Sequence, residues 1–477
     1  MTMKNSIIKT LSLALSLGLA FSGCTKFDED LNKDPNNASK ASGTRLMANT
    51  MLYLPGISSN AYGVHYPQYL SLTTFPNNAR YIETNFSFAS WYGALLNLET
   101  ALNSTLEPSE GPIEHQKAVA KILKAYIFWH MTDRWGDIPF SESLKGDANY
   151  VPKYDKQQDI YNGLFKLLDE ANAHITVITA AGNIKNDIMY AGNIEKWKKL
   201  GNTIHMLMAL RLSKVDPTTG KAEFNKAIAN GIMTSNADNF SFPHLAQAAQ
   251  QNFWFNSFTN LGRQWYAVSK PIVDYMKPLS DPRLPIFADK ASASNDYVGL
   301  AYGLSTDSPP ANFSLLGANL RKQDSPVYLV TYAQALFAMA EAAKLTWITG
   351  GDVTATTNYN NAITESIRQW TGATTGATAY LTNASVVYNP TTAIQQIATQ
   401  RWVHLFLHGY EGWAEWRRTG YPVLTAAPGA NGDQIPRREG YPVNEPQINR
   451  ASYNAAVAAF PYGGSDGLNA RVWWDKP

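Results

Sequence analysis

Two pairs of acidic residues have the spacing that acid–base chemistry requires. They are Asp133 with Asp137, and Glu411 with Glu415. Paired carboxylates can hydrolyse glycosidic bonds, so a surface glycoside hydrolase or a peptidase is one possible function. Each pair lies beside arginine in the sequence, namely Arg134 in the first case and Arg417 and Arg418 in the second. Because a neighbouring arginine lowers a carboxyl pKa, we expect structural ion pairs and predict no catalytic residue.

Two further motifs match catalytic patterns only in part. The segment Gly463–Gly467 (GGSDG) fits the G-x-S-x-G pattern of a nucleophilic serine, but ten residues follow it and none is histidine. His404 and His408 have the spacing of zinc ligands on a helix, but the glutamate of H-E-x-x-H is missing between them. We predict a loop for the first motif and hydrogen-bonded, buried imidazoles for the second. No metal and no cofactor is predicted.

Aromatic residues are the unusual component of the chain. They comprise 13 Trp, 25 Tyr and 19 Phe, or 12% of all residues. Many lie in two segments predicted to be loops, 55–87 and 232–266, together with amide and guanidinium side chains. Rings stack on the C–H faces of sugars while amides bind the hydroxyl groups, so these loops are candidates for binding a glycan or an oligopeptide.

We predict ligand contacts from seven residues of these loops: Tyr66, Asn77, Arg80, Tyr81, Trp254, Arg263 and Trp265. The alternative is that the rings only attach the loops to the helices, since large aromatic side chains are mostly buried in folded proteins.

Amphipathic helices must hold these loops in place. Apolar residues recur with the helical period over 113–134, 155–178, 194–215, 326–349 and 391–417. Shorter helices are expected near 43–54, 88–104, 221–230 and 359–370, and further long loops over 289–325, 372–390 and 419–477. No strong strand alternation is present. The pattern predicts a mainly α protein whose helix pairs form an α-solenoid of the tetratricopeptide type.

The N-terminus has the organisation of a bacterial lipoprotein signal. Lys4 and Lys9 precede an apolar run, Leu11–Phe21, which is too short to span a membrane. Two small residues and Cys24 follow, and the segment FSGC resembles a lipobox, in which the cysteine is acylated. We predict a signal peptide over 1–23, an acidic tether lipid-anchored at Cys24 over 24–40, and one domain over 41–477.

The composition excludes several kinds of site and partner. Cys24 is the only cysteine, which excludes a disulfide framework and a thiolate metal cluster. The chain has 40 Lys+Arg and 38 Asp+Glu, a formal charge of +2, so no basic field is available to attract nucleic acid. Hydrophobic residues make up 45% of the chain, which is enough for a large core and excludes disorder as the main state.

Several segments, in this order, resemble the SusD/RagB family of nutrient-binding outer-membrane lipoproteins, in particular its SusD-like branch with a short N-terminal region. They are Phe27–Asn37, Thr132–Phe140, Pro152–Tyr161, Tyr190–Asn202, Ala340–Ala342, Gln400–Pro422, Ile435–Pro442 and Val472–Asp475. The resemblance implies a tetratricopeptide-like scaffold of helix pairs with a loop-rich, irregular second half. The ligand contacts of this family vary in position, so the seven predicted residues rest on the loop argument alone.

The same resemblance implies a function without catalysis. It implies a protein anchored by lipid in the outer membrane and facing the cell exterior. Such a protein captures a glycan or an oligopeptide and acts as the lid of a SusC/RagA-like TonB-dependent transporter, which imports the nutrient.

Overall fold

A computed structural model describes residues 41–176 and 183–477, and helices dominate them. The longer helices are α2 (Gly43–Met51), α4 (Ala89–Thr100), α5 (Ile113–Trp135), α6 (Gln157–His174), α7 (Ile194–Arg211), α8 (Pro217–Ala229), α12 (Tyr332–Lys344), α13 (Gly351–Thr371), α15 (Ala393–His404), α16 (Gly409–Thr419) and α18 (Arg450–Ala458). The shorter ones are α3 (Pro55–Ser58), α9 (Phe253–Phe255), α10 (Lys270–Met276), α11 (Leu284–Phe287), α14 (Ala377–Leu381) and α17 (Glu445–Ile448). None of the described helices has the length and apolarity needed to cross a membrane. The predicted signal peptide, Cys24 and the tether over 24–40 lie outside the described residues.

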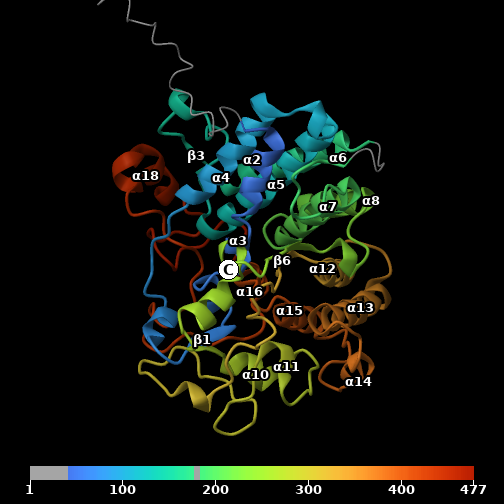
Figure 1. Ribbon diagram of the computed structural model, residues 1–477, viewed down its shortest axis with the longest axis vertical. Coiled ribbons are helices and arrows are strands. Elements are labelled where there is room, and N and C mark those ends of the chain that lie inside the picture. Colours follow the sequence, from blue (N-terminus) through green and yellow to red (C-terminus); the bar gives the residue numbers. More distant parts are fainter. Residues whose placement is uncertain (1–40, 177–182) are drawn as a thin grey trace, which may run out of the picture. The chain divides into compact units, whose positions relative to one another are not determined.

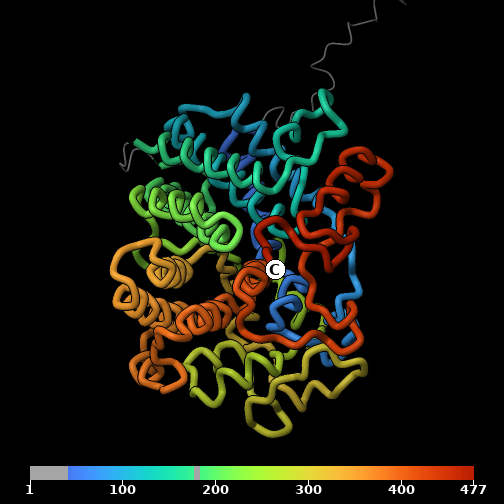
Figure 2. Tube along the Cα trace, turned by 180° about the vertical axis from the view of Figure 1, so that it is seen from behind, coloured from blue at the N-terminus to red at the C-terminus, as the bar shows by residue number. Residues whose placement is uncertain are grey.

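Consecutive helices pack against each other in pairs. α2 packs against α4, α5 against α6, α7 against α8, and α12 against α13. Each pair also contacts the next, through α6 with α7 and through α7 with α12, and Figures 1 and 2 show this succession from opposite sides. The predicted mainly α, tetratricopeptide-like scaffold is confirmed.

The central helix of this scaffold is α5, and local sequence signals delimit it. Pro112 precedes its first residue, and the missing N–H of proline does not destabilise a helix there, because the first N–H groups of a helix have no partner within it. Gly136 follows its last residue with a φ of +83°, and its N–H donates to the carbonyl of Thr132 at 2.8 Å. Nearly all side chains from His115 to Trp135 are buried. α5 is therefore surrounded by other elements and places its C-terminal residues deep inside the protein.

The helix predicted over 391–417 is in fact two helices. α15 ends at His404 and α16 begins at Gly409, because the chain turns between them with Leu407 at a φ of +68°. The residues of the turn are mostly buried, so the apolar pattern continues through the break and conceals it. Two other differences are that α13 begins at Gly351, well before residue 359, and that α18 lies in a segment predicted to be a loop.

Six short strands form three two-stranded antiparallel sheets within the described chain. β1 (Leu70–Leu72) pairs with β5 (Tyr266–Val268), β2 (Ile138–Pro139) with β3 (Tyr154–Asp155), and β4 (Phe240–Phe242) with β6 (Val327–Val330). In the first sheet Leu72 lies opposite Tyr266 and Leu70 opposite Val268. This sheet joins the two aromatic loops of the sequence, 55–87 and 232–266.

A second hydrophobic core lies beneath these loops, apart from the core of the helix pairs. It contains Trp402 and Phe406, which the turn after α15 brings together, and the ring of Phe406 stacks on that of Phe287 with centroids 4.2 Å apart. Tyr69 and Trp254 belong to the same core. The loop-rich part is therefore packed around its own aromatic centre.

Gly409 provides a test of how closely the loops approach the helices. A Cβ at this position would lie 2.3 Å from the carbonyl carbon of Gly63. We expect Gly409→Ala to lower the free energy of unfolding by about 2–3 kcal/mol, because backbone atoms must move. Gly93 in α4 is the control, since a Cβ there has open space. Gly93→Ala is expected to raise stability by about 0.5–1 kcal/mol. Urea denaturation measures both, and equal stabilities would contradict the packing described.

Candidate functional site

Three of the four acidic residues, Asp133, Glu411 and Glu415, lie in a buried network of arginines and carboxylates, which we call the ion-pair network. Arg211 of α7 donates to Asp133 at 3.1 Å, to Glu411 at 2.7 Å and to Glu415 at 2.5 Å. Glu415 and Glu341 each also accept from both Arg401 and Arg418. All these side chains are nearly or fully buried. The prediction of structural ion pairs is confirmed for these three residues, although the partner of Asp133 is Arg211 and not Arg134, which binds Glu439 at 2.6 Å. It is wrong for Asp137, which forms no ion pair with a described residue.

The expected lowering of the carboxyl pKa holds for only one of the four acidic residues of the two pairs. Burial raises the pKa of Asp133 and of Glu411 above the ordinary values, although Arg211 opposes it in both cases. Burial acts in the same direction on Glu415, but Arg418, Arg401 and Arg211 outweigh it and lower its pKa. Burial also raises the pKa of Asp137 to about 6. Its carboxylate accepts the N–H of Gln157 at 2.8 Å and so holds the start of α6.

The two histidines and the G-x-S-x-G motif have structural roles. His404 lies between two hydroxyl groups, 2.7 Å from Thr331 Oγ1 and 3.0 Å from Ser366 Oγ, and His408 Nε2 lies 2.7 Å from the carbonyl of Leu329. Burial lowers their pKa values to about 3 and about 4, so both are neutral near pH 7. The motif at 463–467 is a loop, as predicted, in which Asp466 binds Arg438 at 2.6 Å.

One group of side chains has the composition of a metal site. His205, Asp169 and Glu223 bring their ligand atoms within 4.8 Å of one another. However, the ammonium of Lys226 lies 2.5 Å from Asp169 Oδ2 and 3.3 Å from Glu223 Oε2. A lysine therefore already supplies the positive charge, and this cluster is best described as an ion pair with a histidine.

Three of the seven predicted ligand contacts have buried rings. Tyr66 stacks on Trp413 with centroids 4.5 Å apart and on Tyr81 with centroids 6.2 Å apart. Trp254 packs edge-to-face on Tyr266. The exposed fractions of Tyr66, Tyr81 and Trp254 are 3%, 6% and 1%. These three rings attach the loops to the core, which was the alternative interpretation.

Arg80 is partly exposed, and it ties two loops together. Its two terminal nitrogens donate to the carbonyls of Gly303 at 2.7 Å and Pro428 at 2.8 Å. This guanidinium therefore links the segments around Gly303 and Pro428, and its remaining N–H groups stay available to a ligand.

Of the remaining three residues, Asn77 and Arg263 are exposed and Trp265 is half-buried, and the first sheet brings Trp265 beside Phe75. The N–H of Thr73, just after β1, donates to the carbonyl of Trp265, just before β5, at 2.9 Å. The rings of Phe75 and Trp265 meet edge-to-face at 5.2 Å, and the guanidinium of Arg263 lies 5.8 Å from the Trp265 ring. Phe75 is 58% exposed, and Arg263 and Asn77 are also exposed. We call Phe75, Asn77, Arg263 and Trp265 the aromatic surface.

The backbone at Phe75 is held in an unusual conformation. Its φ of +56° lies in the left-handed region, which costs a non-glycine residue about 1–2 kcal/mol. The N–H of Phe75 donates to the carboxylate of Asp307 at 3.1 Å, which stabilises this conformation. Strain of this kind at an exposed ring points to a functional role. The sequence indicated Phe75 as a loop aromatic but contained no signal of this strain or of its contact with Trp265.

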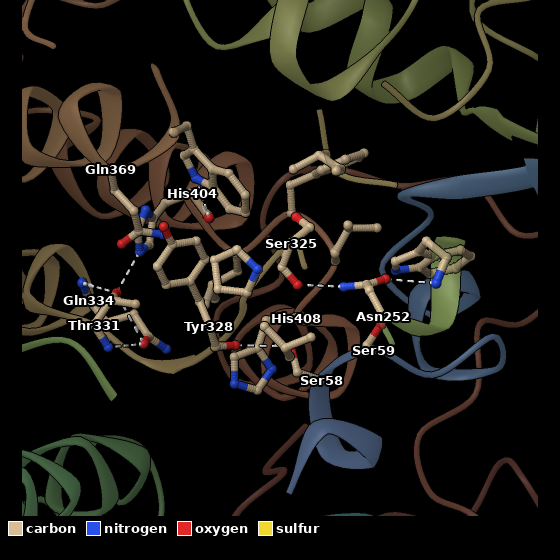
Figure 3. Close-up of a pocket in the computed structure, with 18 residues that line it drawn as sticks. Ser58, Ser59, Asn252, Ser325, Tyr328, Thr331, Gln334, Gln369, His404 and His408 are labelled. Carbon is tan, nitrogen blue, oxygen red and sulfur yellow. Dashed lines mark hydrogen bonds between the residues drawn. The ribbon is translucent and has the colours of Figure 1, made fainter. Parts of the chain in front are cut away.

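Trp254 lines a narrow cavity between the loops and α15, shown in Figure 3. Polar groups of Ser58, Asn252, Tyr328 and His404 surround this cavity, whose volume is about 30 Å³. That space suffices for one or two water molecules and is far too small for a sugar ring. The aromatic surface is therefore the better candidate for binding a glycan.

The fold and this surface define a class of protein: a helix-pair scaffold whose loops present exposed aromatic rings. The sequence model of a family described as "Starch-binding associating with outer membrane", named SusD-like, matches residues 35–442. The chain belongs to this family. No curated protein matches the sequence.

Solved structures agree with this assignment over nearly the whole chain. A chitin-binding protein is similar to it with 28% identity and a TM-score of 0.78, covering 91% of this chain and 100% of its own. A chitin-binding SusD homolog from Flavobacterium johnsoniae has 25% identity and a TM-score of 0.78, covering 91% and 98%. A SusD homolog from Bacteroides fragilis, with 24% identity, a TM-score of 0.79 and coverage of 91% and 100%, supports the fold alone.

The two glutamates of α16 should respond differently to loss of charge. We expect Glu415→Gln to destabilise the protein by about 3–5 kcal/mol, because it leaves three buried arginines short of a carboxylate. Glu411→Gln should change stability by about 1 kcal/mol or less, since burial already disfavours its ionised form. The pair is a matched comparison, because both residues lie on one helix and contact Arg211.

The pH dependence of the Glu411→Gln effect has a definite sign. The pKa of Glu411 is higher in the folded protein than in the unfolded chain, where it has the ordinary value of about 4.3. The free energy of unfolding of the wild type therefore decreases as the pH rises from this value through the folded pKa. The variant lacks this loss. Between about pH 5 and pH 8 the difference in unfolding free energy should therefore move in favour of Glu411→Gln. A constant difference across this range would show that Glu411 is ionised throughout.

Proposed function

We propose that this protein captures a glycan on the aromatic surface and delivers it for uptake. The observation that carries the proposal is the exposed ring of Phe75 against the half-buried ring of Trp265, with the guanidinium of Arg263 beside Trp265 and the exposed amide of Asn77 in the same loop as Phe75. Rings offer a flat apolar face to sugar C–H groups, and Arg263 and Asn77 can bind hydroxyl groups. The names of the similar proteins, chitin-binding and starch-binding, support a glycan over an oligopeptide.

The proposed delivery route follows from the family and the N-terminus. We propose that lipid on Cys24 anchors the protein in the outer membrane, facing the cell exterior. There it acts as the lid of a SusC/RagA-like TonB-dependent transporter. The family description, which places its members at the outer membrane, and the lipobox-like segment before Cys24 support this proposal.

A function without catalysis fits the chemistry of the buried carboxylates. Asp133, Glu411 and Glu415 have almost no exposure and are bound by Arg211. A general acid must reach the glycosidic oxygen of its substrate, which these groups do not in this structure. The relatives named above are binding proteins, which agrees with the same interpretation.

Substitution of Trp265 tests the binding surface. Chitooligosaccharides and maltooligosaccharides are the ligands to use, with isothermal titration calorimetry as the measurement. We expect wild-type dissociation constants between about 1 mM and 1 μM, and about threefold to tenfold weaker binding by Trp265→Ala or Phe75→Ala, because one stacked ring contributes about 0.5–1.5 kcal/mol.

Tyr150→Ala is the matched control for this experiment. Tyr150 is 76% exposed, so its loss also removes an aromatic ring from the surface, but it lies outside the aromatic surface. We expect Tyr150→Ala to bind glycan as the wild type does. Equal affinity of Trp265→Ala and Tyr150→Ala would refute the assignment of this surface.

Substitution of Cys24 tests the anchor and the route. We expect the wild type to incorporate an alkyne analogue of palmitate in cells and to co-purify with a TonB-dependent transporter after mild detergent extraction. Cys24→Ala should lose the label and disappear from the outer-membrane fraction, because the acylated residue is gone. Cys24→Ser is a second variant of nearly the same size that should behave likewise. Retention of the label by either variant would contradict acylation at Cys24.

A further inference from the structure

A polar cleft of about 610 Å³ lies at the C-terminal end of α13, apart from the aromatic surface. Its walls come from the loop before α7, from the segment before β4, and from the last turn of α13. Lys196 and Arg368 line it, together with the side-chain amides of Asn236, Asn239 and Gln369. We call it the Lys196–Arg368 cleft. Its volume is sufficient for an oligosaccharide of a few residues.

One wall of the cleft is a loop that a buried carboxylate holds in shape. Asp187 accepts the N–H groups of Met189 at 2.9 Å, Tyr190 at 3.1 Å and Gly192 at 2.9 Å. It also accepts the indole N–H of Trp197 at 2.7 Å. These four donors therefore occupy the acceptor positions of the Asp187 carboxylate. They hold this wall of the cleft in shape in the ligand-free protein.

The floor of the cleft is bridged by side-chain amides. Asn236 donates to the Glu365 carboxylate at 2.9 Å, and Asn239 donates to Gln369 Oε1 at 3.1 Å. The Nε2 atom of Gln369 is buried and has no hydrogen-bond partner in the described chain. Gln369 and Tyr328 line both this cleft and the narrow cavity in Figure 3. Asn239 therefore fixes the amide of Gln369, whose buried N–H pair is not exposed to a ligand in the cleft.

The two cations of the cleft have unused hydrogen-bonding capacity. Lys196 makes no ion pair with any described residue and lies 5.7 Å from the ring of Tyr190. Arg368 uses only Nε, which lies 3.1 Å from Glu365 Oε2, and its terminal nitrogens donate no hydrogen bond within the described residues. Both acids near these cations, Asp187 and Glu365, already accept several donors. The carboxylate of Asp187 also lines the cleft, so what the cleft offers an anionic ligand is the unused N–H groups of Lys196 and Arg368.

We propose that the Lys196–Arg368 cleft binds an acidic saccharide, with the carboxylate of a hexuronic acid unit held by Arg368 and with Lys196 adding positive charge to the same cleft. The paired terminal nitrogens of an arginine match the two oxygens of a carboxylate, and the amides of the floor can bind the ring hydroxyls. The site extends the proposed glycan-binding function to a second class of sugar. It does not depend on the aromatic surface.

The test uses oligosaccharides of galacturonic, mannuronic and glucuronic acid, each beside its methyl ester. The ester retains the sugar ring and loses the charge. By isothermal titration calorimetry on the full domain, we expect at least one acid to bind and its ester to bind about tenfold or more weakly. Arg368→Gln and Lys196→Gln should each weaken binding of the acid by about tenfold or more, and added salt should weaken it further.

Lys166→Gln is the matched control, since Lys166 is an exposed lysine of α6 that does not line the cleft. It should bind the acid as the wild type does. Trp265→Ala separates the two sites, because it should weaken binding of neutral glycans and leave binding of the acid unchanged. The inference is overturned if no uronic acid binds, if acid and ester bind equally, or if the Arg368→Gln and Lys196→Gln proteins bind like Lys166→Gln. If the binding of neutral glycans alone were lost, only the assignment of the aromatic surface would be affected.

Discussion

The fold depends on one buried ion-pair network that takes a residue from each of five helices. Asp133 comes from α5, Arg211 from α7, Glu341 from α12, Arg401 from α15 and Glu415 from α16. Removing such charges from water costs several kcal/mol per ion, and only close pairing offsets this cost. The helices can therefore pack only in arrangements that keep all these contacts. Hydrophobic packing alone would tolerate more variation, so the network selects one relative placement of the helix pairs and the C-terminal helices.

That placement determines where the binding loops lie. From the network, α15 extends to Trp402, whose indole donates to the carbonyl of Pro67 at 2.9 Å and whose own carbonyl accepts from Tyr69 at 2.8 Å. Tyr69 immediately precedes β1, and β1 together with β5 places Phe75 against Trp265. A continuous chain of contacts thus runs from the buried charges to the aromatic surface. The loops that carry the aromatic surface are thus attached to α15 by hydrogen bonds.

The sequence predicted the helices well because each buries one side with the helical period, and it predicted the binding residues only in part. Trp254 and Trp265 lie eleven positions apart in one loop, yet the first is fully buried and the second is only half-buried. Their exposure depends on the pairing of β1 with β5, and strands of three residues leave no periodic signal. Arg211 likewise stands 78 positions from Asp133, so local sequence suggested Arg134 instead.

The proposed capture and release place opposite demands on the two sites. Two rings on an open surface contribute only a few kcal/mol, so a neutral glycan held there would leave readily for a transporter. Charge-assisted contacts in the Lys196–Arg368 cleft would hold an acidic sugar longer, because such hydrogen bonds are about twice as strong as neutral ones. Screening by salt reduces that difference at an exposed site. The ionic strength of the surroundings would therefore set which of the two sugar classes the protein retains, with no change in the fold.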